Sequence, residues 1–174
     1  MELIEDLLTI VDRNDQVVGY LSKNKSHQSP GILHRAFSIF IFNNKGELLL
    51  QKRSSFKDLW PGVWSNSCCS HPKKGEKIKK AAEERLAEEL GFSCPLKFMG
   101  KIKYQACWLD KGCEKEITYV FKGEYNDLVK PDPKEVQEII WISLLELKKE
   151  IKVNPEKYTP WLREIIKKFP MTNF

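Results

Sequence analysis

Short stretches in which hydrophobic and polar residues alternate recur along the chain, and this period of two predicts β-strands. The predicted strands, in chain order, are Leu7–Asp12, Gln16–Leu21, Phe37–Phe42, Glu47–Arg53, Lys97–Ala106, Glu114–Lys122 and Val136–Ile142. Polar turns join the first two as an N-terminal β-hairpin and the next two as a second hairpin. Both alternating faces of Phe37–Phe42 are apolar, so this strand should be central and covered on each side.

Other stretches carry the period of an α-helix. An apolar residue at every fourth position predicts a long helix from near Glu76 to Gly91, where a glycine can end it. Its apolar stripe consists of Ile78, Ala82, Leu86 and Leu90. Two shorter helices are predicted at Leu144–Ile151 and Trp161–Lys168, the second with Thr159 as its N-cap. The stretch from residue 23 to residue 32 reads as a polar loop. This order of elements, without an internal repeat, predicts an α+β fold in one domain, residues 1–174.

The charges of the long helix run against its dipole. Lysines occupy its first half and glutamates its second, whereas the macrodipole favours the opposite order. Glu84 and Glu88 lie one turn apart and should repel each other. A solvated, charge-rich face is the ordinary explanation, but a divalent cation would also compensate the repulsion. We favour the cation because a loop containing Cys68, Cys69 and His71 leads directly into the helix.

The long helix also follows a known spacing, that of the Nudix box, a loop and helix that binds a divalent cation and diphosphate. The residues that follow this spacing are Glu76, Arg85, Leu86, Glu88, Glu89, Gly91 and Phe92. Two positions depart from the box. Ser70 stands where the box has its first glycine, and Glu84-Arg85 stands where it has Arg-Glu, so one acidic position is lost.

Longer ungapped motifs surround this helix. They are LHRAFS at 33–38, WPGVW at 60–64, NSCCSHP at 66–72 and YTPW at 158–161. Together they resemble the type 1 isopentenyl-diphosphate isomerases, a branch of the Nudix fold that isomerises its substrate rather than hydrolysing it. The resemblance runs from about Glu5 to Trp161. It implies a Nudix-like fold with a mixed β-sheet between helices, and the interconversion of isopentenyl and dimethylallyl diphosphate through a tertiary carbocation in isoprenoid biosynthesis.

Three imidazoles and two carboxylates indicate a metal site. The histidines of the chain are His27, His34 and His71, and all three fall in or near polar loops. Glu114 and Glu116 project side by side from one face of a predicted strand. Nitrogen and oxygen ligands together suit Mn²⁺ or Zn²⁺ better than Mg²⁺. The resemblance implies that these five residues form the family's His3Glu2 metal site.

The resemblance also implies residues that bind and convert the substrate. The implied diphosphate-binding residues are Lys23, Ser38, Arg53, Lys57 and Arg85. Mg²⁺ would meet the diphosphate at Glu89 and the main-chain oxygen of Cys69. Cys69 and Glu116 would transfer protons, with Tyr104 hydrogen-bonded to the carboxylate of Glu116. Trp161 would face the carbocation. Judged from the residues alone, a structural thiol at Cys69 and a packing role for Trp161 stay open.

Composition limits the classes of partner and the cellular compartment that we expect for the chain. The net charge of +5 suits a small anionic substrate and does not require nucleic acid. No apolar run approaches membrane-spanning length, and we expect no signal peptide. Five cysteines are an odd number, so we expect a reducing cytoplasm, and buried or incidental thiols at Cys94, Cys107 and Cys113. A monomer or a homodimer is expected.

Two other functions stay open on the sequence. The first is a Nudix hydrolase of a diphosphate-containing substrate, against which the departures at Ser70 and Arg85 argue, together with the pair Cys69 and Trp161. The second is a non-catalytic module that binds RNA through the lysines between residues 73 and 80. A solvated lysine face is the preferred explanation, but strongly salt-dependent retention of nucleic acid would support the module.

Overall fold

The computed structural model describes residues 7–171, so the start of the resemblance at Glu5 and both ends of the predicted domain 1–174 lie outside the described residues. The strands are β1 (Leu7–Val11), β2 (Val17–Ser22), β3 (His34–Phe42), β4 (Glu47–Arg53), β5 (Trp64–Ser65), β6 (Cys68–Ser70), β7 (Lys97–Trp108), β8 (Gly112–Glu124) and β9 (Val136–Ser143). The helices are α1 (Lys23–His27), α2 (Ile78–Leu90), α3 (Leu144–Val153) and α4 (Pro160–Lys168), with a 3-10 turn at Pro155–Lys157. None of these helices is long and apolar enough to cross a membrane.

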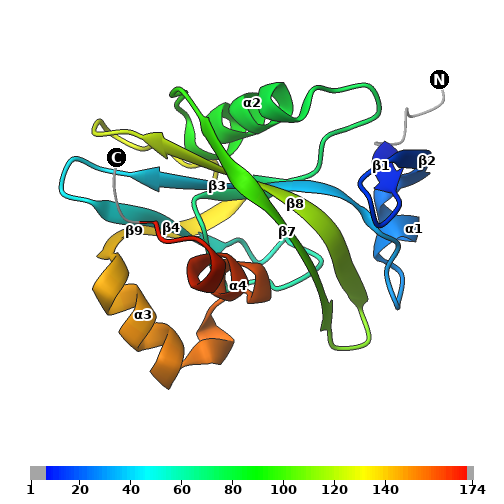
Figure 1. Ribbon diagram of the computed structural model, residues 1–174. Coiled ribbons are helices and arrows are strands. Elements are labelled where there is room, and N and C mark those ends of the chain that lie inside the picture. The colour runs from blue at the N-terminus through cyan, green and yellow to red at the C-terminus, as the bar shows by residue number, and fades with distance from the viewer. Residues whose placement is uncertain (1–6, 172–174) are drawn as a thin grey trace.

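The strands form one mixed sheet, as predicted, with β3 at its centre (Figure 1). β3 runs parallel to β8 along its whole length, from His34 opposite Glu116 to Phe42 opposite Glu124. The predicted N-terminal hairpin, β1 with β2, is antiparallel, and so is the long β7–β8 hairpin. Because parallel pairing joins distant segments, the sheet brings the N-terminal third of the chain to the strand that carries the predicted carboxylates.

Helices cover both faces of this sheet, with α2 on one face and α3 and α4 on the other (Figure 1). Ile39 and Ile41 pack into the same buried cluster as Leu86 of α2. Phe40, the residue between them, packs into the opposite cluster with Leu162 of α4. The alternation confirms that β3 is a central strand covered on each side, which is what two apolar faces require.

The three predicted helices begin and end within two residues of the bounds that the sequence pattern gives. α2 begins at Ile78, two residues after the predicted start, and ends at Gly91, which has a φ of 75° and donates its N–H to the carbonyl of Ala87. Thr159 occupies the N-cap position of α4, but its hydroxyl makes no capping bond. Instead, its Oγ1 lies 3.2 Å from Oγ of Ser65, so this threonine ties α4 to β5.

The glutamates of α2 have partners within the helix, which corrects one inference from the sequence. Nζ of Lys80 lies 3.3 Å from Glu84, and Nη1 of Arg85 lies 2.9 Å from Glu88. These ion pairs provide the local compensation that the sequence pattern did not reveal. The charge order of the helix is therefore no argument for a metal.

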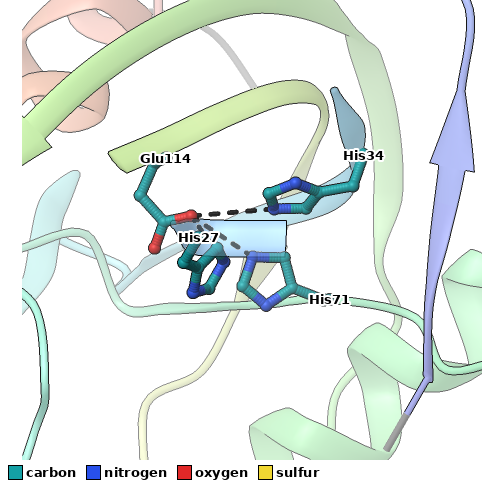
Figure 2. Close-up of side chains that lie close together, drawn as sticks. All are labelled: His27, His34, His71 and Glu114. Atoms are coloured by element: carbon teal, nitrogen blue, oxygen red, sulfur yellow. Dashed lines mark ion pairs between the residues drawn. The ribbon is translucent and has the colours of Figure 1, made fainter. Parts of the chain in front are cut away.

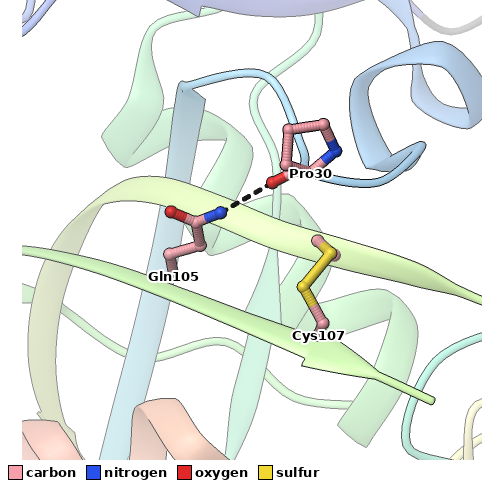
Figure 3. Close-up of a disulfide and its surroundings, with 4 residues drawn as sticks. Pro30, Gln105 and Cys107 are labelled. Atoms are coloured by element: carbon pink, nitrogen blue, oxygen red, sulfur yellow. Dashed lines mark hydrogen bonds between the residues drawn. A yellow bond between two sulfur atoms is a disulfide. The ribbon is translucent and has the colours of Figure 1, made fainter. Parts of the chain in front are cut away.

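A disulfide bond joins Cys107 and Cys113 across the β7–β8 hairpin (Figure 3). The prediction of incidental thiols at these two positions was wrong, because it considered a scaffold of several bridges and not a single bond within one hairpin. Cys94 is a free thiol. Close to the bond, Nε2 of Gln105 donates to the carbonyl of Pro30 at 2.7 Å (Figure 3). The hairpin therefore contacts the segment that follows α1.

Candidate active site and metal centre

A cavity of about 320 Å³ gathers most of the predicted site residues. Those that line it are Lys23, His27, Ser38, Arg53, Lys57, Cys69, His71, Arg85, Tyr104, Glu114, Glu116 and Trp161. Two predicted residues are buried beside these, His34 against Glu114 and Glu89 against Arg85. The fold therefore brings all of the predicted side chains to one region, although they come from segments spread over most of the sequence.

Three imidazoles surround the carboxylate of Glu114 at one end of this region (Figure 2). Oε2 of Glu114 lies 3.0 Å from Nε2 of His27, 3.6 Å from Nε2 of His71 and 3.7 Å from Nε2 of His34. His27 is the last residue of α1, so the predicted polar loop begins with a short helix. Helix α1, strand β3, the segment after β6 and strand β8 each supply one member of this cluster.

The donor atoms of the cluster fit a divalent cation. Nδ1 of His34 lies 2.6 Å from the carbonyl of Ile32 and donates to it, which leaves the lone pair of Nε2 directed at the cluster. Nε2 of His27, Nε2 of His34 and Oε2 of Glu114 are buried and face one another, yet within residues 7–171 none of them forms a hydrogen bond with acceptable geometry. Buried polar atoms without a hydrogen bond are costly. With His71 these residues offer four ligand atoms that all lie within 4.8 Å of one another, so they could hold a metal ion.

The charges in the cluster agree with this interpretation. Burial disfavours a charge on His34, yet the carboxylates of Glu114 and Glu116 raise its pKa to about 10. The imidazole of His34 therefore favours its protonated form, because it lies between two anionic groups. A cation bound by histidine and glutamate ligands supplies the same compensation.

Glu116, the fifth predicted ligand, lies at the edge of the cluster, and its two oxygens have different partners. Oε1 is 2.9 Å from Nε2 of His71. Oε2 accepts hydrogen bonds from Oη of Tyr104 at 2.7 Å and from Oγ1 of Thr118 at 2.8 Å. The predicted Tyr104–Glu116 contact is therefore present. One oxygen of Glu116 faces the histidines, and the other faces two hydroxyls.

The two adjacent cysteines lie on a short strand, β6, and not in the loop that the sequence predicts. β6 pairs with β3, with Ser38 opposite Cys69. Successive residues of a strand face opposite sides, so the two thiols point away from each other. Cys68 is buried in the core beneath α2, whereas Cys69 lines the cavity, with its Sγ 3.9 Å from Nη1 of Arg53.

Cys69 and Glu116 have opposite protonation states at neutral pH. Burial raises the pKa of the Cys69 thiol to about 11, so the sulfur keeps its proton. Burial and the charge of Glu114 oppose the ionisation of Glu116, but the neighbouring imidazoles of His34 and His71 hold its pKa below the ordinary value. A protonated thiol and an ionised carboxylate therefore line the same cavity.

The indole of Trp161 lines the cavity and packs in a cluster with other aromatic rings. The guanidinium of Arg53 lies 5.5 Å from the ring centroid of Trp161, so the face of this indole already accommodates a positive charge. Trp60 meets Trp161 edge-on at 5.1 Å. Nε1 of Trp161 donates to Oγ of Ser65 at 3.0 Å and lies 3.1 Å from Oδ1 of Asn66. The ring is thereby fixed in orientation as well as packed.

Arg85, one of the predicted diphosphate-binding cations, lines the cavity and is held by Glu89. Arg85 donates through Nε to Oε1 of Glu89 at 2.9 Å, and Gln51 donates to Oε2 of the same carboxylate at 2.9 Å. Glu89 is only 2% exposed, so its pair with Arg85 is a buried one and not the surface ion pair that its spacing alone would suggest.

Sequence reasoning missed two residues of this region. Gln51 holds the carboxylate of Glu89, and Glu135 contacts both Lys57 and Arg85. Neither residue belongs to a motif. Glu135 lies 78 positions after Lys57 in the chain, so no local pattern could have paired them.

Comparison with known proteins places these features in a family. A model of the NUDIX domain matches residues 32–169. The chain is 43% identical over 163 residues to the isopentenyl-diphosphate Delta-isomerase 2 of Photorhabdus laumondii subsp. laumondii, a match that covers 94% of this chain and 92% of the relative. It is 40% identical to the isopentenyl-diphosphate Delta-isomerase of Serratia proteamaculans, over 94% of this chain and 91% of the relative.

Solved structures show the same fold at lower identity. A crystal structure of a protein from Deinococcus radiodurans has a TM-score of 0.78 and 18% identity, covering 93% of this chain and 98% of that one. The MutT protein of Methanosarcina mazei has a TM-score of 0.64 and 23% identity, covering 78% and 91% respectively. At these identities the likeness concerns the fold alone, and it confirms the predicted Nudix-like architecture.

Proposed function

The chain belongs to the NUDIX domain family and, within it, to the isopentenyl-diphosphate Delta-isomerases, and from this we propose how its cavity moves a double bond. The substrate is isopentenyl diphosphate, which is interconverted with dimethylallyl diphosphate. The observation that carries the mechanism is the pair of groups in opposite protonation states, the Cys69 thiol and the Glu116 carboxylate, which line one cavity with the face of Trp161.

The reaction requires a proton to be added at one carbon and another to be removed from a second carbon. One of the two residues, Cys69 or Glu116, supplies a proton, and the other accepts one. Tyr104 and Thr118 each donate a hydrogen bond to Oε2 of Glu116 and keep the carboxylate oriented. Protonation leaves a tertiary carbocation. The indole of Trp161 stabilises it through its π face, while the surrounding aromatic rings exclude water that would trap it.

Two cations complete the proposal. Mn²⁺ or Zn²⁺ would bind His27, His34, His71, Glu114 and Glu116, a donor set that suits these ions. Mg²⁺ would bind with the substrate at Glu89 and the main-chain oxygen of Cys69. The metal near Glu116 would supply positive charge that organises this carboxylate and lowers its affinity for a proton.

The diphosphate end of the substrate would meet cations. Lys23, Arg53, Lys57 and Arg85 line the cavity, and Ser38 lies among them. Several donors are needed, because a single contact cannot hold a diphosphate against its hydration in water. We further propose that the chain is one catalytic domain that works as a monomer or homodimer in the cytoplasm without nucleic acid or membrane. The odd number of cysteines was one argument for a reducing cytoplasm, and the Cys107–Cys113 disulfide bond removes that argument.

The activity is tested by incubating the metal-loaded protein with isopentenyl diphosphate and Mg²⁺ in D₂O. We expect deuterium in the dimethylallyl diphosphate that forms, without release of phosphate. Phosphate release without isomerisation would instead indicate a Nudix hydrolase, the function that the shared fold also permits.

The role of Trp161 is tested by two substitutions at one position. Trp161→Leu should lower kcat by roughly 30-fold with little change in substrate affinity, because a desolvated cation–π contact contributes about 2 kcal/mol. Trp161→Phe keeps a π face, so its kcat should stay well above that of the leucine variant. Both variants lose the hydrogen bond to Ser65, so their difference isolates the ring face. Equal rates in the two variants, with weakened substrate binding, would show that Trp161 only packs.

A further inference from the structure

Glu135 contacts two of the predicted diphosphate-binding cations from the segment that precedes β9. Its Oε1 lies 2.7 Å from Nη2 of Arg85, and its Oε2 accepts a hydrogen bond from Nζ of Lys57. All three side chains line the same cavity. A carboxylate shared by two cations at a site that must bind an anion needs an explanation, because it lowers the positive charge there.

The main chain around Glu135 is fixed by hydrogen bonds to two other parts of the site. Its carbonyl accepts from the N–H of Ser54, just after β4, at 3.1 Å. Its own N–H donates to the carbonyl of Asp132 at 3.0 Å, and the N–H of Asp132 donates to the carbonyl of Glu89 at 2.9 Å. The carboxylate therefore starts from a backbone that is tied both to the end of β4 and to the end of α2.

Glu135 keeps its charge at working pH. Burial opposes ionisation, but hydrogen bonds from Lys57 and Arg85 lower the pKa of this carboxylate to about 2. Its two bonds to cations are accordingly charge-assisted throughout the neutral range, and such bonds are the strong ones.

The guanidinium of Arg85 is held on three sides. Nε donates to Glu89 at 2.9 Å, Nη1 to Glu88 at 2.9 Å, and Nη2 pairs with Glu135 at 2.7 Å. A guanidinium has five N–H groups, so each terminal nitrogen retains one N–H that can reach a ligand. Lys57 differs, because its ammonium sits on a flexible four-carbon stem that a fixed carboxylate can hold in one direction.

We propose that Glu135 is a positioning residue for the diphosphate end of the substrate, because it holds Lys57 and Arg85 in the directions that the diphosphate oxygens require. The inference rests on the proposed function of the cavity. Preorganised cations bind an anion more tightly than mobile ones, since their order need not be imposed on binding. The gain from this order exceeds the loss from one added negative charge.

The test measures the binding of inorganic pyrophosphate with Mg²⁺ to the metal-loaded full chain by calorimetry, and isomerisation in parallel. Glu135→Gln keeps the shape of the side chain and removes its charge. We expect its Kd for pyrophosphate and its KM to rise about tenfold, with kcat changed less than about twofold, because an anchor that contributes equally in the ground and transition states affects binding alone.

Glu138→Gln is the matched control. Glu138 lies three residues away on β9, half exposed, 3.8 Å from Nζ of Lys52, and it does not line the cavity described here. Its pyrophosphate affinity and KM should equal those of the parent chain. Glu135→Asp keeps the charge on a shorter side chain and should fall between the parent and the glutamine variant. If Glu135→Gln does not fold, the Kd and KM of Glu135→Asp are compared with those of the parent chain instead.

Two outcomes would overturn the inference. An unchanged Kd and KM in Glu135→Gln would show that the carboxylate only stabilises the fold, and a tighter Kd would show that it only neutralises the cations. Pyrophosphate binding does not depend on isomerisation. A parent chain that binds pyrophosphate but leaves isopentenyl diphosphate unchanged would contradict the proposed function and still leave the Glu135 test valid.

Discussion

Cys69→Ala is expected to lower isomerisation by about 1,000-fold or more, the order of rate enhancement that a positioned acid or base can supply. The Cys69 side chain lines the cavity, so its loss removes one of the two proton-transfer groups. Its main-chain oxygen remains, and both metals and the diphosphate should bind nearly as before. Cys69→Ser should retain only a trace of activity, because a hydroxyl is a poorer acid and its conjugate base is harder to form.

Cys68→Ala provides the control on the neighbouring residue. Cys68 is fully buried beneath α2, so this variant should lose some packing energy but remain active. Turnover and substrate affinity are measured for all three variants at the same metal content. If Cys68→Ala is inactive and Cys69→Ala is active, the proton-transfer thiol is Cys68, and the assignment to Cys69 is wrong by one residue. Full activity in both alanine variants would mean that no thiol takes part.

His71→Ala should lose the metal of the histidine cluster and most of the activity. His71 also contacts Oε1 of Glu116, at 2.9 Å, so its loss disturbs the metal ligands and the proposed proton-transfer carboxylate together. Replacing an outer-shell partner of a metal typically costs 10–100-fold, and a direct ligand should cost at least about 100-fold. Metal content, measured by elemental analysis after reconstitution, and turnover are the two readouts.

Lys74→Ala is the control for the histidine variant. Lys74 lies three residues further along the same segment, with its Nζ 5.1 Å from the ring centroid of Tyr20, and it neither belongs to the cluster nor lines the cavity. This variant should keep its metal and its activity. If the reconstituted parent chain binds neither manganese nor zinc, the assignment of the cluster is wrong, whatever the activity of the variants.

The core of the fold could be predicted because its signals are strong and local. Two apolar faces marked β3 as a central strand, and the four-residue stripe with Gly91 at its end marked α2. The pattern failed where the backbone responds to tertiary partners. Cys68–Ser70 is only three residues long, and it becomes a strand because β3 offers it a hydrogen-bonding edge. No periodicity in three residues could indicate that.

The site could be predicted as far as its residues fall in continuous motifs or share a strand face. Glu114 and Glu116 follow from the period of two along β8. Gln51 and Glu135 could not be found, because their partners lie far away in the sequence and meet them only when β4, α2 and the segment before β9 pack together. The Cys107–Cys113 bond was missed for a different reason, since spacing alone does not say which thiols face each other across a hairpin.

The parallel pairing of β3 with β8 gives the metal cluster a thermodynamic consequence for the whole chain. It sets His34 opposite Glu116, so the ligand set comes together only when this long-range pairing has formed. A cation that binds the native chain and not the unfolded one then stabilises it by mass action, by about 2.7 kcal/mol at a free concentration 100 times its Kd. Melting curves recorded over a series of metal concentrations should therefore shift to higher Tm, and the heat tolerance of the enzyme would follow the metal supply of its surroundings.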